Sequence, residues 1–204
     1  MAGAWSIFLS DERGVISSGH SLVFETERLA VRTATEEDVE LLHALWSNPQ
    51  VMRNVEFPHG LRVTRCELRE RLSKQGTSEF EKLLVVELRA TGQAIGECKL
   101  SCPGDKGIAE PDVKLLPEFW GQKYGVEVWR GILAYQFAHT DCHAVQATPN
   151  KENIASIRMQ EAVGAVCVGE DVYRLPEAVQ DCTTPVHHYI YRVKRADWER
   201  QRTT

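Results

Sequence analysis

The chain has 204 residues, of which 43% are hydrophobic, and a formal net charge of −5. This length and apolar content suit one hydrophobic core, and we interpret residues 21–204 as one domain that follows an N-terminal extension, residues 1–20. The acidic balance argues against direct nucleic-acid binding, because proteins that bind phosphate backbones carry an excess of Lys and Arg. It mildly favours a cationic partner such as an amine.

Cysteine and histidine spacing argues against a metal site or a disulfide scaffold. The six cysteines form no C-x-x-C pair, and the seven histidines show no ligand spacing. We therefore expect reduced thiols, no bound metal and a cytoplasmic location. No apolar run approaches the roughly eighteen residues of a membrane span. Residues 1–9 lack the basic flank of a signal peptide.

The first third of the chain predicts a strand and two helices. Residues 21–32 are strand-like. Two capping boxes then follow, in which a Thr side chain and a carboxylate three residues later satisfy each other's backbone N–H groups. The first box is Thr35 with Asp38, and the second is Thr64 with Glu67. Each box predicts the start of a helix.

The rest of the chain alternates strands with helices. Residues 82–88 and 94–101 flank a turn and predict a hairpin. Further strands are expected at residues 109–116, 144–148, 166–173 and 187–193, with helices from about residue 124 to 139 and from residue 153. A helix between the fourth and fifth of these predicted strands implies a parallel pair. The alternation predicts an α/β (α+β) fold whose mixed sheet is covered on both faces.

The connection into the long helix contains two glycines, Gly121 and Gly125. The first turn of a helix carries backbone N–H groups without partners and the positive end of the helix dipole, so it can hold an anion such as a phosphate. Glycine lets the backbone approach a bound group closely. An ordinary strand-to-helix connection explains this stretch equally well on its own.

Two motifs resemble the GNAT superfamily of acyl-CoA-dependent N-acyltransferases, most closely the branch of ribosomal-protein N-terminal acetyltransferases. That branch has a phosphate turn W-G-x-G-Y-A-T-E-A, which the chain matches at Trp120, Gly121, Tyr124, Gly125 and Glu127. A later helix reads N-x-x-S with a glycine further on, matched at Asn153, Ser156 and Gly164.

Further segments extend the resemblance over about residues 22–198. Residues 25–32 resemble the family's opening strand, and residues 46–52 resemble the loop after its first helix. Residues 194–200 resemble its last strand and the R-x-x-W that trails it, so Trp198 is expected to pack back on the fold.

Lys123 stands where the family has the central glycine of the turn. Its Cβ crowds that position and restricts φ. Either its ammonium lies near a pyrophosphate, or the turn is altered and binds coenzyme weakly. Aligning residues 122–125 with the family's Q-x-x-G instead would restore the glycine but put Glu127 where a small residue belongs. We prefer the first register.

The resemblance implies a mixed, mostly antiparallel sheet of about seven strands, splayed between the fourth (residues 109–116) and the fifth (residues 144–148). It also implies acetyl-CoA as co-substrate, with its pantetheine arm filling that gap. Pro111 fits a break in pairing there, because proline donates no ladder hydrogen bond. The residues implied to hold the coenzyme are Val113, Leu115, Leu116, Gly121, Gln122, Lys123, Tyr124, Gly125, Val126, Asn153 and Ser156.

Acyl transfer to an amine requires a base, an oxyanion donor and a proton for the departing thiolate. The resemblance implies that Glu110 takes the ammonium proton, with Asp112 on the same face two residues later. It implies that the Ser156 hydroxyl donates a hydrogen bond or a proton to the coenzyme sulfur. Other relatives use a tyrosine four positions after this serine. This chain has Gln160 there, so it lacks that tyrosine. Each of these residues also has a purely structural interpretation. Glu110 and Asp112 would then be solvated carboxylates, Ser156 a small packing residue and Asn153 a helix cap.

The sequence therefore predicts a cytoplasmic acetyl-CoA-dependent N-acetyltransferase. The acceptor would be a primary amine, either a protein N-terminus or a small amine, and loops rather than the fold choose between them. A catalytically weak or inactive acyl-CoA-binding regulatory module stays open because of Lys123 and the missing tyrosine. No membrane or nucleic-acid partner is predicted, and a homodimer is left open.

Overall fold

The computed structural model describes residues 20–55, 57–173 and 186–203. The extension predicted for residues 1–20 therefore lies, apart from His20, outside the described residues. Within the described ranges, no helix is both long and apolar enough to cross a membrane.

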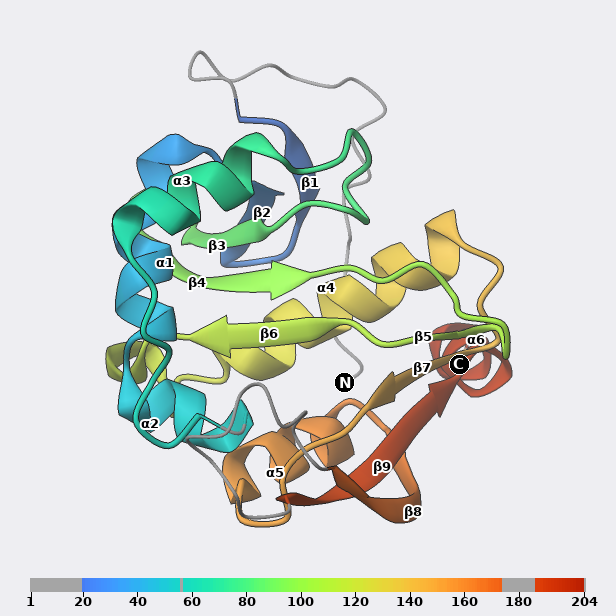
Figure 1. The fold of residues 1–204 in the computed structure, drawn as a ribbon. Coiled ribbons are helices and arrows are strands. Elements are labelled where there is room, and N and C mark those ends of the chain that lie inside the picture. Colours follow the sequence, from blue (N-terminus) through green and yellow to red (C-terminus); the bar gives the residue numbers. More distant parts are fainter. Residues whose placement is uncertain (1–19, 56, 174–185, 204) are drawn as a thin grey trace.

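Nine strands of the described chain form two sheets, one below the other in Figure 1. The first sheet is antiparallel throughout, with the order β1-β2-β3-β4-β6. Its strands are β1 (Leu22–Glu25), β2 (Leu29–Thr33), β3 (Leu84–Leu88), β4 (Ala94–Lys99) and β6 (Asp112–Leu115). The second sheet has the order β5-β7-β9-β8 and pairs only β5 with β7 in parallel. Its strands are β5 (Ile108–Ala109), β7 (Ala144–Ala147), β8 (Val166–Tyr173) and β9 (Val186–Lys194).

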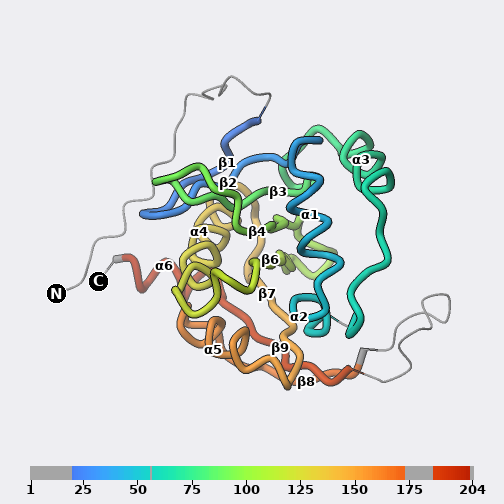
Figure 2. The backbone as a smooth tube through the Cα atoms, turned by 90° about the vertical axis from the view of Figure 1, so that its left-hand side faces the viewer, coloured from blue at the N-terminus to red at the C-terminus, as the bar shows by residue number. Residues whose placement is uncertain are grey.

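Helices cover both faces of the first sheet, as Figure 2 shows. On one face lie α1 (Val39–Trp46), α2 (Pro49–Met52) and α3 (Arg65–Ser73), and on the other lies α4 (Tyr124–His139). Two more helices complete the fold: α5 (Ile154–Ala162), which contacts α4, and α6 (Arg195–Thr203). Short 3-10 turns are η1 (Glu36–Asp38), η2 (Arg53–Val55) and η3 (Pro117–Phe119). The predicted mixed α/β architecture is confirmed.

Residues 108–115 form one extended segment that belongs to both sheets. Its first part pairs with the second sheet through Ala109 and Val145, and its second part pairs with β4. Glu110 and Pro111 separate the two parts, and beyond them β6 and β7 diverge (Figure 1). The predicted splay is confirmed, and Pro111 lies at the break because it has no N–H to donate. Among the described residues, one edge of β6 therefore has no strand partner.

Alternation along the strands supplies a hydrophobic core to each face of the first sheet. Leu84 and Val86 pack toward α4, together with Ile132 and Leu133 of that helix. Val85, between them in the chain, packs on the opposite side with the apolar faces of α1 and α3. A single buried strand, β3, therefore packs against the helices on both faces of the sheet.

Both predicted capping boxes are present, at Thr35 with Asp38 and at Thr64 with Glu67. The first box opens the 3-10 turn η1, which continues directly into α1. The single strand expected at residues 21–32 is in fact a hairpin of β1 and β2, in which the Thr26 N–H donates to the Leu29 carbonyl at 2.8 Å.

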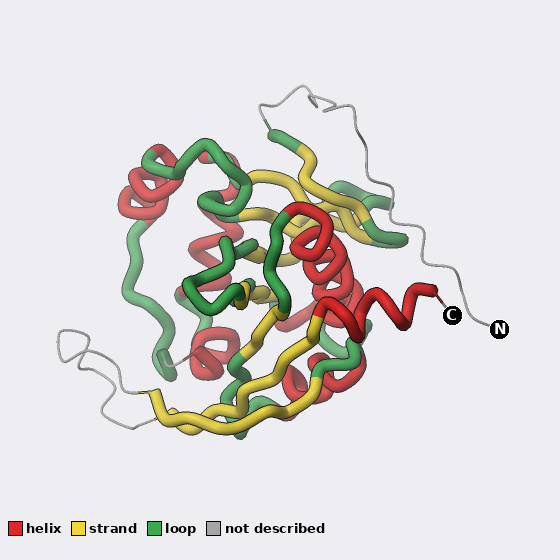
Figure 3. The backbone as a smooth tube through the Cα atoms, turned by 90° about the vertical axis from the view of Figure 1, so that its right-hand side faces the viewer, coloured by secondary structure: helices red, strands yellow, loops and turns green. Residues whose placement is uncertain are grey.

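The prediction of a final strand at residues 194–200 was wrong, because the chain forms α6 after Lys194. Asp197 in the first turn and Arg200 and Arg202 in the last complement the helix dipole. The expected packing of Trp198 is confirmed, since its ring lies 6.1 Å from that of Phe137. Figure 3 shows α6 continuing directly from β9.

Candidate active site

The connection between β6 and α4 presents six consecutive backbone N–H groups, those of residues 121–126. Among the described residues, none of these six donates to a protein acceptor, and the first helical N–H that does is Glu127, to the Lys123 carbonyl at 3.1 Å. The dipole of the 16-residue helix α4 adds positive potential at the same end. We call residues 121–126 the amide cradle, and its chemistry suits an anion such as a phosphate.

Lys123 adopts the backbone conformation of the glycine that it replaces. Its φ is +65°, and within the described chain no other non-glycine residue has positive φ. Gly121 also has a positive φ, +75°. A left-handed lysine costs about 1–2 kcal/mol relative to a right-handed conformation. The cradle therefore keeps the shape of a glycine turn, which supports the first of the two registers considered above.

Gly125 lies at a close approach between two helices. A Cβ at this position would lie 3.0 Å from the Sδ of Met159 in α5. The glycine therefore lets the first turn of α4 pack directly against α5.

Thr26 and Arg28 brace the cradle from the first sheet. The carboxylate of Glu127, only 6% exposed, accepts hydrogen bonds from the Thr26 hydroxyl at 2.6 Å, the Arg28 N–H at 2.7 Å and the Arg28 Nε at 2.6 Å. The Arg28 guanidinium also lies 4.4 Å from the Tyr124 ring centroid and donates to the Gln122 carbonyl at 3.3 Å. Sequence reasoning missed these roles, although both residues lie in the matched segment 25–32.

The unpaired edge of β6 offers main-chain groups to the gap between the sheets. Leu116 donates its N–H to Ile95 of β4 at 2.9 Å, so alternate residues, Val113 and Leu115, face away from β4. The Val113 N–H bonds its neighbour Asp112 at 2.9 Å, and the Leu115 carbonyl accepts from Trp120 Nε1 at 2.8 Å. The Val113 carbonyl and the Leu115 N–H are left facing the gap.

Leu116, also expected to bind coenzyme, offers no main-chain group to the gap. Its N–H bonds Ile95, and its carbonyl accepts from the Phe119 N–H at 3.0 Å.

Glu110 lies at the break between β5 and β6 with an exposed side chain. Its Oε1 accepts a 2.8 Å hydrogen bond from Gln146 Nε2, and Gln146 Oε1 in turn accepts from Arg192 Nε at 2.8 Å. This chain of side chains crosses from β5 to β7 and β9, so it fixes the carboxylate where the two sheets separate. Sequence reasoning did not identify Gln146, whose place depends on strand register.

Asp112 forms an ion pair with Lys114. The Lys114 ammonium also lies 3.4 Å from Oε1 of Glu97, a carboxylate that is 1% exposed and accepts from Trp46 Nε1 at 2.7 Å. Burial alone would lower the pKa of Lys114, but the carboxylates of Asp112 and Glu97 raise it above that of an ordinary lysine. Asp112 thus serves as a counter-ion, which leaves Glu110 as the better candidate base.

The start of α5 places Asn153 and Ser156 together. Asn153 is the N-cap, and its Oδ1 accepts from the Ser156 N–H at 3.1 Å. The expected cap is therefore confirmed. Ser156 is half-buried, and its hydroxyl has no hydrogen-bond partner in the part of the chain that the structure describes.

The fold and site define an α/β protein with an amide cradle at a helix N-terminus beside two splayed strands. Residues 28–166 match the family model of the acetyltransferase (GNAT) domain, so the chain belongs to the GNAT acetyltransferase family. A similar protein is the uncharacterized N-acetyltransferase p20 of Bacillus licheniformis, 26% identical over 139 residues, which span 66% of this chain and 76% of that protein. The ribosomal-protein branch stays a prediction from the motifs.

Solved structures share the fold at low sequence identity. One is the spermidine N-acetyltransferase from Vibrio cholerae in complex with CoA and spermine, with a TM-score of 0.71, 20% identity and coverage of 85% of this chain and 99% of that one. An acetyltransferase of the GNAT family from Bacillus anthracis has a TM-score of 0.69, 21% identity and coverage of 85% and 98%. The aminoglycoside acetyltransferase AAC(6')-Ib in complex with coenzyme A has a TM-score of 0.64, 18% identity and coverage of 85% and 99%.

Proposed function

We propose that this protein transfers an acetyl group from acetyl-CoA to a primary amine, either a protein N-terminus or a small amine, in a ternary complex. The observation that carries the proposal is the continuity of the amide cradle with the unpaired edge of β6. The pyrophosphate would bind the N–H groups of residues 121–126, with the Lys123 ammonium beside them. The pantetheine arm would bind the Val113 carbonyl and the Leu115 N–H as an added strand does.

In the transfer step, the amine nitrogen forms a bond to the thioester carbonyl carbon, and the C–S bond breaks. Glu110, held by Gln146, would take a proton from the ammonium so that the nitrogen lone pair becomes nucleophilic. A main-chain N–H near Leu115 would stabilise the oxyanion. The Ser156 hydroxyl would donate its proton to the departing thiolate and take up the second proton, which the nitrogen releases as the amide forms.

We also propose a cytoplasmic location. The five cysteines of the described residues form no disulfide with one another, which is compatible with a reducing compartment.

The proposal is tested by two measurements on the full chain. Calorimetric titration with acetyl-CoA measures binding, and a free-thiol assay with a panel of peptide N-termini, amino acids, polyamines and aminoglycosides measures transfer. We expect binding together with thiol release that depends on the acceptor. Binding without turnover for any amine would instead favour the regulatory module, and absence of binding would refute both.

A further inference from the structure

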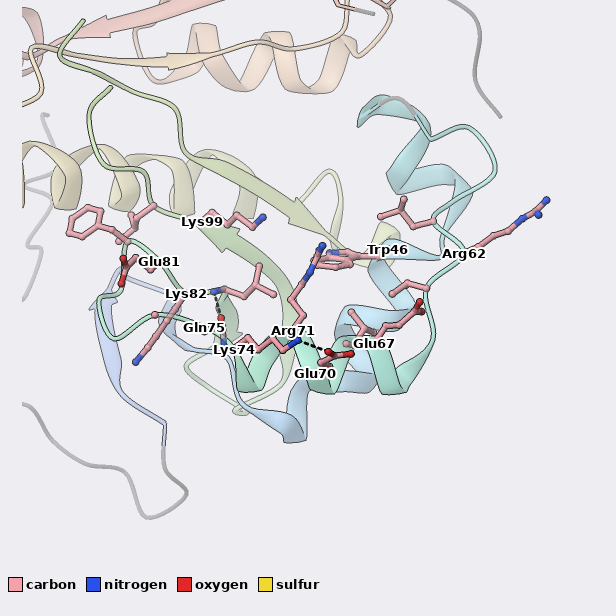
Figure 4. A pocket seen from close by; sticks show the side chains of 17 residues that line it. Trp46, Arg62, Glu67, Glu70, Arg71, Lys74, Gln75, Glu81, Lys82 and Lys99 are labelled. Carbon is pink, nitrogen blue, oxygen red and sulfur yellow. Dashed lines mark hydrogen bonds and ion pairs between the residues drawn. The ribbon is translucent and has the colours of Figure 1, made fainter. Parts of the chain in front are cut away.

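A pocket of about 810 Å³ opens on the face of the first sheet that carries α1 and α3 (Figure 4). Lys99 and Leu100 at the end of β4 form part of its lining, together with Trp46 from the end of α1 and residues of α3. This volume lies in the range of about 300–1,000 Å³ typical of small-molecule sites. None of the predicted coenzyme-binding residues lines it.

The pocket adjoins the strand that carries the candidate catalytic groups. Lys99 is the cross-strand partner of Asp112, so the β4 part of the lining is one strand spacing, about 4.8 Å, from β6. Trp46 connects the two regions directly, because its Nε1 donates to Glu97, which in turn contacts Lys114. Glu110 lies two residues before Asp112, at the break between β5 and β6. A molecule in this pocket could therefore reach the break between β5 and β6.

Two cations point into the pocket without a carboxylate partner among the described residues. The Arg71 guanidinium lies over the Trp46 ring, 5.0 Å from its centroid, and Lys99 extends toward the same end of the pocket (Figure 4). Of the other lining cations, Lys74 pairs with Glu70 at 2.5 Å, and Lys82 and Arg62 point outward. The lining carboxylates Glu67 and Glu81 accept hydrogen bonds from the N–H groups of Thr64 and Ser78. The end of the pocket beside Trp46, where Arg71 and Lys99 lie, is thus locally basic although the chain as a whole is acidic.

We propose that this pocket binds the acceptor and that the acceptor carries an anionic group, a carboxylate or a phosphate, in addition to its amine. Arg71 and Lys99 bind the anion, and the amine extends toward Glu110. Guanidinium and ammonium groups form charge-assisted hydrogen bonds with such anions, whereas a polycationic acceptor would be repelled. This inference rests on the proposed acetyl transfer, and it narrows the acceptor class.

The test measures kcat/KM by thiol release for matched acceptors. Three tetrapeptides begin with serine and differ only in having two acidic, two neutral or two basic residues next. Glutamate, phosphoethanolamine and spermidine form a second set, which separates a peptide source of the anion from a small-molecule source. We expect the acidic peptide or an anionic small amine to exceed its neutral and basic counterparts by about tenfold.

Charge-removing variants then assign the effect to the pocket. Arg71→Gln and Lys99→Gln should each reduce kcat/KM for the anionic acceptor by about tenfold and reduce it much less for the neutral peptide, whereas Lys82→Gln should leave both values unchanged. Faster acetylation of spermidine or of the basic peptide, or an equal loss for all acceptors in both variants, would overturn the inference while leaving acetyl transfer intact. Absence of turnover with every amine would overturn the proposed function, and this inference with it.

Discussion

The hydroxyl of Thr26 donates a 2.6 Å hydrogen bond to the buried carboxylate of Glu127, 101 positions later in the chain. Arg28 adds an ion pair of 2.6 Å to the same carboxylate. The turn between β1 and β2 is therefore fastened to the first turn of α4, where the amide cradle lies. These contacts link two segments that resemble the family's sequence, residues 25–32 and the phosphate turn at residues 120–127.

Glu127→Ala should destabilise the protein and loosen the cradle. The change leaves Thr26 and Arg28 without their shared acceptor, so we expect a loss of about 1–3 kcal/mol in the free energy of unfolding, measured by urea denaturation. Glu118→Ala, at an exposed position of η3, is the matched control and should stay within about 0.5 kcal/mol of the wild type. Equal stabilities for the two variants would contradict this account.

Variants at Lys123 separate backbone strain from charge. Lys123→Gly should be about 1 kcal/mol more stable than Lys123→Ala, because glycine adopts a φ of +65° without strain. Both variants lose the ammonium, so both should bind acetyl-CoA about two- to fivefold more weakly in calorimetric titration. Tighter binding by the glycine variant than by the wild type would show that the lysine obstructs the cradle.

Glu110→Gln should lower kcat/KM about a hundredfold near neutral pH and flatten its dependence on pH, because an amide cannot take the ammonium proton. Asp112→Asn is the comparison, since Asp112 is engaged by Lys114, and its effect should be much smaller. An unchanged pH profile for the Glu110 variant would remove it as the base.

Two variants separate the helix-capping role of Asn153 from its proposed role in binding acetyl-CoA. Asn153→Ala should cost about 1 kcal/mol of stability, because α5 loses its N-cap, whereas Asn153→Ser keeps a capping oxygen and should cost little. We expect both to raise the KM for acetyl-CoA, since neither side chain supplies an amide. A serine variant with wild-type kinetics would leave Asn153 a purely structural role.

Local patterns predicted much of this fold. The capping boxes at Thr35 and Thr64 and the break at Pro111 depend on residues close together in the chain, so sequence reveals them. The sequence left open whether Lys123 alters its turn, and the structure gives it the positive φ of a glycine. The tail was misassigned because the family resemblance was followed in place of the helix-favouring charges after Arg195.

The side-chain contacts of Glu110 and of Lys114 could not be predicted, because they depend on strand register. Glu97 and Lys114 become neighbours only when β4 and β6 pair in the observed register, and Gln146 meets Glu110 only because β5 lies beside β7. A shift of one residue would send each side chain to the opposite face. No local pattern in the sequence specifies these pairings.

Acidification should weaken the buried ion pair between Asp38 of η1 and Arg32 of β2. Burial would raise the pKa of Asp38, but hydrogen bonds from Arg32, at 2.7 and 2.8 Å, and from the Thr35 N–H, at 2.8 Å, lower it below its ordinary value of 3.8. A lowered native pKa contributes stability that is present above the unfolded pKa and is lost as pH falls through the native one. The free energy of unfolding should therefore decline below about pH 4.

Asp38→Asn tests this assignment by urea denaturation between pH 7 and pH 2.5. At pH 7 we expect a loss of about 3–5 kcal/mol, because Arg32 is left buried with one carboxylate partner fewer. Below pH 4 the variant should lose stability less steeply than the wild type, since the titrating group is gone. Parallel curves for the two proteins would mean that other carboxylates, and not Asp38, carry the acid sensitivity.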